Sequence, residues 1–230
     1  MSKRNKLMKF AEILSFPNVY ENFEIGNDVL THHEGTDVQM KGNWHSVHFN
    51  NNNPITLELA CGGGEYSVAL AQRYPDRNFI GVDIKGARIW KGARRALAEG
   101  LHNVAFLRTR IEQIAQFFAP YEVSEIWITF PDPFLANSRA NRRLTSPQFH
   151  ERYRQFLHTG GLVHLKTDSP ELYDFTLLTL AEDEKCTLIY QNNDIYSGEL
   201  VTDELDIKTH YEKIHLSKQK TIKYIKYIIN

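Results

Sequence analysis

From residue 54 onward, short apolar runs alternate with amphipathic stretches, and this alternation limits the fold more than any other feature. The runs that read as strands are Ile55–Cys61, Phe79–Ile84, Val104–Leu107, Glu125–Phe130 and Leu162–Leu165. A segment with helical spacing follows each of them. Strands that alternate with helices form βαβ units and a parallel sheet, and continuously apolar strands indicate a sheet covered on both faces. The sequence therefore predicts an α/β fold with a doubly wound, mostly parallel sheet.

The two ends of the chain depart from this pattern. Cys186–Gln191 and Thr221–Ile229 read as closing strands, and we expect an antiparallel C-terminal strand. Residues 1–53 show no comparable periodicity and open on the cations Lys3, Arg4, Lys6 and Lys9 without an acid. We therefore predict an irregular basic N-terminal arm over residues 1–53 and one domain over residues 54–230.

The composition limits the ligands, the cellular location and the covalent or metal cross-links that we expect. The net charge of −1 and the pI near 6.8 exclude a uniformly basic nucleic-acid-binding surface, although basic residues can still be gathered locally. Cys61 and Cys186 are far apart and belong to no CxxC pair, so we expect no disulfide framework, no metal site and a cytoplasmic location. No apolar run is long enough for a membrane span or a signal peptide. The expected assembly is a monomer or a weak homodimer.

A glycine-rich turn follows the first strand. In "ELACGGGEY" the residues Gly62, Gly63 and Gly64 connect that strand to a helix, and Asp83 ends the second strand about twenty residues later. Ligands of open parallel sheets bind at the carboxyl ends of the strands, where glycines admit a ligand and an acid binds ribose hydroxyls. This spacing favours a nucleotide-like ligand over a plain turn with a solvated Asp83.

Two further acids restrict that ligand. Glu65 lies in the first turn of the helix, where it would repel a diphosphate, and Glu58 lies within the strand itself. A cationic ligand with ribose and adenine but no phosphate fits these acids better. S-adenosylmethionine is such a ligand. Glu58 is the better candidate for an acid that faces the ligand, and the alternative is a buried acid that pairs with a local cation.

The stretch "ITFPDPFLANSRANRRL" holds one acid rigidly beside several cations. Prolines on both sides of Asp132 fix two φ angles, and Pro131 also restricts Phe130. Arg139, Arg142 and Arg143 follow in the loop, where they could bind phosphates or remain solvated. The alternative is that Asp132 is a solvated residue in a simple strand stop.

Five motifs in this order resemble the tRNA (guanine-N7)-methyltransferases. They are E-L-A-C-G-G-G, N-F-I-G-V-D, F-P-D-P with its basic loop, G-G-L-V-H-L-K-T-D and a late T-x-x-E. The resemblance runs from about Leu57 to the C-terminus. It implies a Rossmann-like methyltransferase fold that transfers a methyl group from S-adenosylmethionine to a guanine in the variable loop of tRNA.

The same resemblance implies roles for individual residues. Glu58, Gly62, Gly64 and Asp83 would bind the cofactor, and Asp132 would be the catalytic residue between cofactor and guanine. The residues that would face the tRNA are Asp168, Thr209, Glu212, Arg139, Arg142 and Arg143. Thr209 and Glu212 could instead form a capping box, because Thr-x-x-Glu is also a common helix start.

Several positions depart from the family pattern. Ala60 stands where Gly is usual, and Asp83 where Glu is frequent. Arg110 replaces an acid that commonly contacts the cofactor, and Ala136 replaces a substrate-binding Lys. These changes concern residues that bind the cofactor and the RNA. They therefore bear on the affinity for both ligands more than on membership of the family. A small-molecule methyltransferase and a non-catalytic module that binds S-adenosylmethionine or RNA are the alternative functions.

Guanine N7 carries a lone pair and no proton, so its methylation needs no general base. The protein must instead align the two substrates and stabilise the charge that moves onto the purine. A rigid carboxylate that accepts hydrogen bonds from the guanine edge would serve both tasks. This is the role that we expect for Asp132.

Overall fold

The computed structural model describes residues 3–230, with side chains described from residue 7 onward. The side chains of Lys3, Arg4 and Lys6, part of the expected basic arm, lie outside the described residues. The helices are α1 (Lys3–Ile13), α2 (Glu65–Arg73), α3 (Gly86–Ala98), α4 (Pro147–Tyr153), α5 (Pro170–Glu182) and α6 (His210–Ser217). Shorter turns of 3-10 helix cover His33–Gly35, Ile111–Gln116, Asn137–Arg142 and Asp203–Asp206, and a π-helical turn covers Trp44–Phe49.

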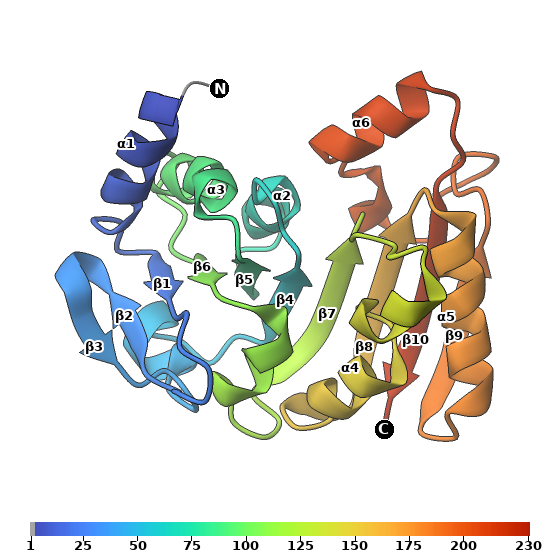
Figure 1. Cartoon of the computed structure of the whole chain (residues 1–230), viewed down its shortest axis with the longest axis horizontal. Helices are drawn as coiled ribbons and strands as arrows, with labels where there is room; N and C mark the ends of the chain where they lie inside the picture. The colour runs from blue at the N-terminus through green and yellow to red at the C-terminus, as the bar shows by residue number, and fades with distance from the viewer. Residues whose placement is uncertain (1–2) are drawn as a thin grey trace.

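A ten-stranded sheet runs through this part of the chain (Figure 1). Its strands are β1 (Val19–Glu21), β2 (Leu30–His32), β3 (Thr36–Val38), β4 (Ile55–Leu59), β5 (Asn78–Asp83), β6 (Val104–Arg108), β7 (Val123–Thr129), β8 (Leu157–Thr167), β9 (Cys186–Asn192) and β10 (Lys223–Ile229). Their order is β3-β2-β1-β6-β5-β4-β7-β8-β10-β9. The block from β1 and β6 to β8 is parallel, and β10 is antiparallel to β8 and β9. The predicted doubly wound sheet with an antiparallel C-terminal strand is confirmed.

Apolar clusters cover both faces of the sheet. One cluster joins the sheet to α1, α2 and α3, and the other joins it to α4, α5 and the turn Trp44–Phe49 (Figure 1). Every residue of β4 is buried, and its Ile55, Leu57 and Leu59 face the second cluster. A strand covered on both faces needs apolar residues at nearly every position, which explains the continuous apolar runs of the sequence.

The N-terminal segment differs from the irregular arm that the sequence predicted. Within it, β1 pairs in parallel with β6, with Val19 opposite Phe106, and β2 and β3 extend the same sheet. The buried carboxylate of Glu122 accepts hydrogen bonds from the backbone N–H groups of Gly42 and Trp44, at 2.8 and 3.2 Å. Strands of three residues are too short to show a period, so no sequence pattern marked them.

The pairing of β4 determines where the functional residues meet. In the parallel ladder Leu59 lies opposite both Val82 of β5 and Ile128 of β7. The chain segments that follow these three strands therefore leave the sheet at the same edge.

In the described part of the chain, no helix is long and apolar enough to cross a membrane.

Candidate functional site

A cleft opens at the carboxyl ends of β4, β5 and β7. Its wider part has a volume of about 550 Å³, a size typical of small-molecule sites. A narrower part adjoins it along the segment after β6, and both parts share Ala60, Asp83, Ile84, Asp132 and Arg142. The edge of the sheet that the sequence predicted for a ligand therefore carries a cleft.

The glycine turn forms the floor of the wider part. Gly62 and Gly64 have φ angles of +57° and +67°, and Ala60 before them has +59°. A Cβ atom on Gly62 would meet nothing within 4 Å, whereas on Gly64 it would lie 2.5 Å from the Phe106 ring. The turn thus leaves open space at Gly62, and Gly64 is required for packing of the turn against β6. Only Gly62 of this pair lines the cleft.

Asp83 closes the glycine turn onto β5. Its Oδ2 accepts a hydrogen bond from the Gly62 N–H at 2.9 Å, and its Oδ1 accepts one from the Lys85 N–H at 2.7 Å. The side chain is 7% exposed and lies on the wall of both parts of the cleft. Asp83 therefore fixes the position of Gly62 while it presents a carboxylate to the cleft.

Glu58 lies beneath the turn and does not line the cleft. Its Oε2 accepts hydrogen bonds from the Ser67 N–H and hydroxyl, and its Oε1 accepts one from the Thr129 hydroxyl at 2.8 Å. Burial raises the pKa of Glu58 to about 7, against the lowering effect of these hydrogen bonds. The carboxyl group thus links β4 to the start of α2 and to the end of β7.

Asp132 is exposed on the wall shared by the two parts of the cleft. Its Oδ1 accepts a hydrogen bond from the Phe134 N–H at 3.1 Å, and among the described residues its Oδ2 has no partner. Phe130 and Phe134 on either side have φ angles of +51° and +41°. The preference of a pre-proline residue for extended backbone, expected at Phe130, is therefore overridden. Such strain gathers at functional sites.

The three arginines of the loop divide into two kinds. Arg142 lines the cleft and its guanidinium lies 4.8 Å from the Phe134 ring centre, while Arg139 is exposed outside the lining. Arg143 is 5% exposed and donates to the carbonyl oxygens of Pro133 and Phe134 at 3.0 and 3.1 Å. The expectation that Arg143 contacts phosphates is thus corrected, because the side chain is buried and its Nε and Nη2 hold two carbonyl groups of the loop around Asp132.

The two residues of the late motif T-x-x-E also differ in their positions relative to the cleft. Thr209 lines the cleft, but its Oγ1 accepts a hydrogen bond from the Glu212 N–H at 3.2 Å and so caps α6. Glu212 is fully buried and lies 2.8 Å from the ammonium group of Lys166. The structure therefore displays the helix cap that the sequence left open as an alternative, and it places the Glu212 carboxylate behind the cleft wall.

Asp168 lies to the side of the cleft. Its Oδ2 is 2.5 Å from Nζ of Lys220 and 3.2 Å from Nδ1 of His215. Asp168 is absent from the lining of both parts of the cleft. In the described structure it ties the end of β8 to α6.

Other cleft residues escaped the sequence analysis. Arg88 and Tyr211 line the wider part, with the guanidinium 5.7 Å from the tyrosine ring centre. Thr109 lines the narrower part, and among the described residues its buried hydroxyl has no hydrogen-bond partner. No motif marks Arg88 or Thr109, whereas Tyr211 lies inside T-x-x-E and could have been singled out. Arg110, at the position of a usual acid, lines the narrower part too.

The buried Glu58 makes stability depend on pH. Its folded pKa of about 7 lies above the ordinary value of 4.5, so its contribution is present in acid and lost as the pH rises through 7. At about 1.4 kcal/mol per pKa unit the loss approaches roughly 3 kcal/mol. In denaturant unfolding, Glu58→Gln should therefore gain stability relative to the parent between pH 5 and pH 8. A parallel pH dependence of the two proteins would contradict the raised pKa.

Comparison with known proteins places the chain in a family. A family profile described as "Putative methyltransferase" matches residues 52–225. The protein named tRNA (guanine-N(7)-)-methyltransferase from Bacteroides fragilis is 48% identical over 98% of this chain and 86% of its own length.

Two solved structures share the fold. The 16S rRNA methyltransferase KamB has a TM-score of 0.61 at 14% identity, covering 85% of this chain and 96% of its own. A 16S rRNA (adenine(1408)-N(1))-methyltransferase mutant from Catenulisporales acidiphilia, solved with its cosubstrate SAM, has a TM-score of 0.55 at 13% identity, covering 87% and 96%. The profile match and the 48% identity over 98% of the chain show that the chain belongs to the tRNA (guanine-N7)-methyltransferase family.

Proposed function

We propose that this protein transfers a methyl group from S-adenosylmethionine to N7 of a guanine in tRNA. The observation that carries the proposal is the rigid Asp132, which projects a free carboxylate oxygen into a cleft bounded by the glycine turn. Family membership supports the substrate, and the cleft supports the cofactor. The glycine turn and Asp132 line the same cleft, so the cofactor and the guanine would meet there.

The cleft fits S-adenosylmethionine in charge and in shape. Gly62 leaves open space above the turn, and Asp83 presents a carboxylate of the kind that binds ribose hydroxyls. Glu65, at the first turn of α2, lines the same part and favours a cation over a phosphate. The narrower part adjoins the wider one and would hold the adenine. Glu58 would act indirectly, by holding Ser67 and the turn.

When bound, the cofactor supplies an electrophilic methyl group on a sulfonium. A bond forms from N7 to the methyl carbon as the carbon–sulfur bond breaks, and the electron pair of that bond stays on sulfur. No proton is transferred, so the protein needs no base. Asp132 would accept hydrogen bonds from the guanine N1–H and amino group, which become stronger donors as the ring gains positive charge. The hydrogen bonds of the Phe130 N–H and of Arg143 hold this strained segment, and with it the carboxylate, in place.

We infer that the exposed cations at the mouth of the cleft contact tRNA phosphates. Arg142 and Arg88 line the mouth, and Arg139 lies beside it in the same loop as Arg142. Arginine binds phosphate with paired donors, and Phe134 and Tyr211 add aromatic surface against which a base can stack. Arg143 supports this surface from below and takes no part in the contact.

The catalytic role of Asp132 predicts the effect of one substitution. Asp132→Asn keeps the shape and removes the charge, so turnover on tRNA should fall by about 10²–10³, as for loss of one transition-state hydrogen bond. Affinity for tRNA should change little. The measurement is single-turnover transfer of a labelled methyl group together with filter binding. Asp168→Asn, in the carboxylate tied to Lys220 and His215, is the matched control and should lose far less. Equal losses in rate and binding would show that Asp132 is structural.

The division among the loop arginines predicts a difference in salt dependence. Replacing Arg139 and Arg142 by Ala should reduce the slope of log K against log salt by about 0.9 for each lost phosphate contact. Arg143→Lys should instead lower the melting temperature and leave the slope as in the parent, because that side chain holds carbonyl groups. Titration of tRNA at several salt concentrations measures the slopes. A slope that falls only in Arg143→Lys would reverse the assignment.

A further inference from the structure

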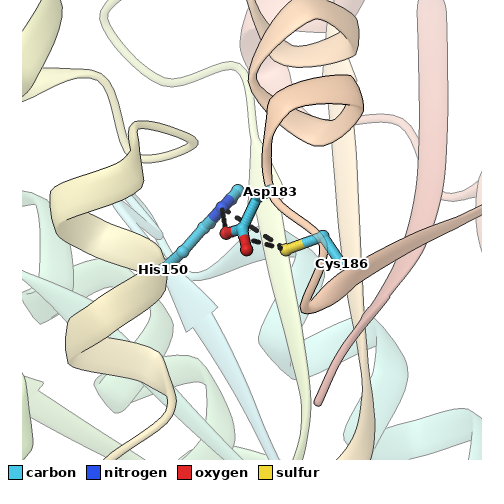
Figure 2. Close-up of side chains that lie close together, drawn as sticks. All are labelled: His150, Asp183 and Cys186. Carbon is cyan, nitrogen blue, oxygen red and sulfur yellow. Dashed lines mark hydrogen bonds and ion pairs between the residues drawn. The ribbon is translucent and has the colours of Figure 1, made fainter.

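Three potential metal ligands meet at the edge of the sheet opposite the cleft. His150 lies on α4, Asp183 directly follows α5, and Cys186 begins β9 (Figure 2). Cys186 pairs with Ile229 of β10, which in turn lies opposite Gly161 near the start of β8. The cluster is therefore far from the carboxyl ends of the strands, and nothing in the methylation chemistry uses it.

The ligand atoms have the separations of a tetrahedral site. Cys186 Sγ lies 3.3 Å from Asp183 Oδ2 and 3.6 Å from His150 Nδ1, and His150 Nδ1 lies 3.5 Å from Asp183 Oδ2. Zinc bonds of about 2.3 Å to sulfur and about 2.0–2.1 Å to nitrogen or oxygen place tetrahedral ligands roughly 3.3–3.6 Å apart. The three ligand atoms therefore already have the mutual separations that one tetrahedral ion requires.

The surroundings hold the imidazole in the right orientation. His150 is fully buried, and its Nε2 lies 3.2 Å from the hydroxyl of Tyr227 on β10. A ligand histidine commonly engages its second ring nitrogen in this way, which leaves the other nitrogen free for the metal. Because α4 and the strands β9 and β10 carry these groups, the site stands on regular secondary structure.

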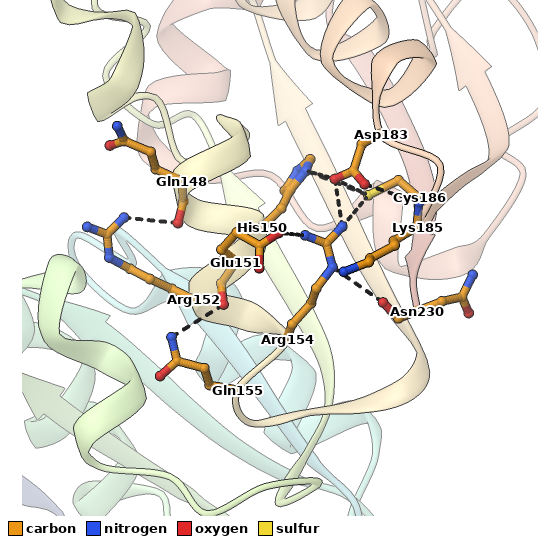
Figure 3. Close-up of polar contacts among 10 residues, drawn as sticks. All are labelled: Gln148, His150, Glu151, Arg152, Arg154, Gln155, Asp183, Lys185, Cys186 and Asn230. Carbon is orange, nitrogen blue, oxygen red and sulfur yellow. Dashed lines mark hydrogen bonds and ion pairs between the residues drawn. The ribbon is translucent and has the colours of Figure 1, made fainter.

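A positive group already faces the cluster. Arg154 donates from Nη2 to Asp183 Oδ2 at 2.6 Å, and the same nitrogen lies 3.6 Å from Cys186 Sγ (Figure 3). Its other nitrogens donate to Glu151 at 2.6 Å and to the Asn230 carbonyl at 3.3 Å. The Arg154 guanidinium thus provides the positive charge that a bound cation would otherwise provide. A cation would have to displace the guanidinium from Oδ2 of Asp183. Lys185 and Glu184 beside the cluster are exposed.

We propose that His150, Asp183 and Cys186 form a binding site for one thiophilic divalent cation of the zinc class. The imidazole, the carboxylate and the thiolate would supply three ligands, and solvent the fourth. On binding, the Cys186 thiol releases its proton to solvent and a sulfur–metal bond forms. The ion would clamp α4, the end of α5 and the C-terminal strands together, so its role would be stability of the fold.

No spacing pattern in the sequence marks these three residues as metal ligands. The spacing of Asp183 and Cys186 is short, but His150 is more than thirty residues away, and no second cysteine lies near any of them. Only the sheet, which brings β9 beside β10 and under α4, unites the three residues. The expectation of no metal site rested on the absence of a CxxC pair, and such a pair is only one of several ligand patterns.

Metal binding by the full-length protein tests the proposal. Chelator-stripped protein is titrated with Zn²⁺ against a chromogenic chelator, and with Cd²⁺ to detect thiolate-to-metal charge-transfer absorption. We expect one ion per chain and a rise in melting temperature with Zn²⁺. Cys186→Ser and Asp183→Asn should each weaken binding by more than the about 10–100-fold typical of lost outer contacts, and Cys186→Ser should abolish the Cd²⁺ absorption.

Two matched variants control for unspecific binding. Glu184→Gln removes an exposed acid next to the cluster, and Cys61→Ser removes the other thiol of the chain; both should bind the ion like the parent. Circular dichroism without metal verifies that each variant is folded. If Cys186→Ser does not fold, the metal affinity of Asp183→Asn decides whether the cluster binds the ion. Absence of binding by the parent, or undiminished binding by the folded Cys186→Ser or Asp183→Asn, would overturn the proposal.

Discussion

The parallel pairing of β4 with β5 on one side and β7 on the other is the constraint on which the cleft depends. Because these strands end at the same edge, the glycine turn, Asp83 and the Phe130–Asp132 segment leave the sheet side by side. The Asp83 carboxylate then ties the Gly62 and Lys85 N–H groups together. One carboxylate thus closes the turn of one strand onto the end of the next.

Strain is concentrated around this edge and is held by contacts from behind. Ala60, Phe130 and Phe134 have positive φ angles, and each such residue costs on the order of 1–3 kcal/mol. The Phe130 N–H donates to the Lys166 carbonyl at 2.8 Å, and Arg143 donates to two carbonyl groups of the following loop. These contacts offset the strain and leave Asp132 with a fixed direction. Rigidity of the acid is what alignment of two substrates requires.

The sequence predicted the sheet, the glycine turn and the placement of Asp132 because these follow from local patterns. Continuous apolar runs mark buried parallel strands, and prolines mark a rigid segment. It failed where residue roles depend on what lies behind them in three dimensions. Arg143 and Glu212 looked like surface residues of a loop and a helix, but Arg143 is buried under the Asp132 loop and Glu212 pairs with Lys166. The short strands of the N-terminal segment carry no detectable period.

The function proposed for this cleft is methylation of guanine N7 in tRNA. The most direct test is mass spectrometry of the nucleosides from unmodified tRNA after incubation with the protein and S-adenosylmethionine that carries a labelled methyl group. We expect labelled N7-methylguanosine with the parent and almost none with Asp132→Asn. Label on another base or another guanine atom, or cofactor binding without methylation of any tRNA, would contradict it.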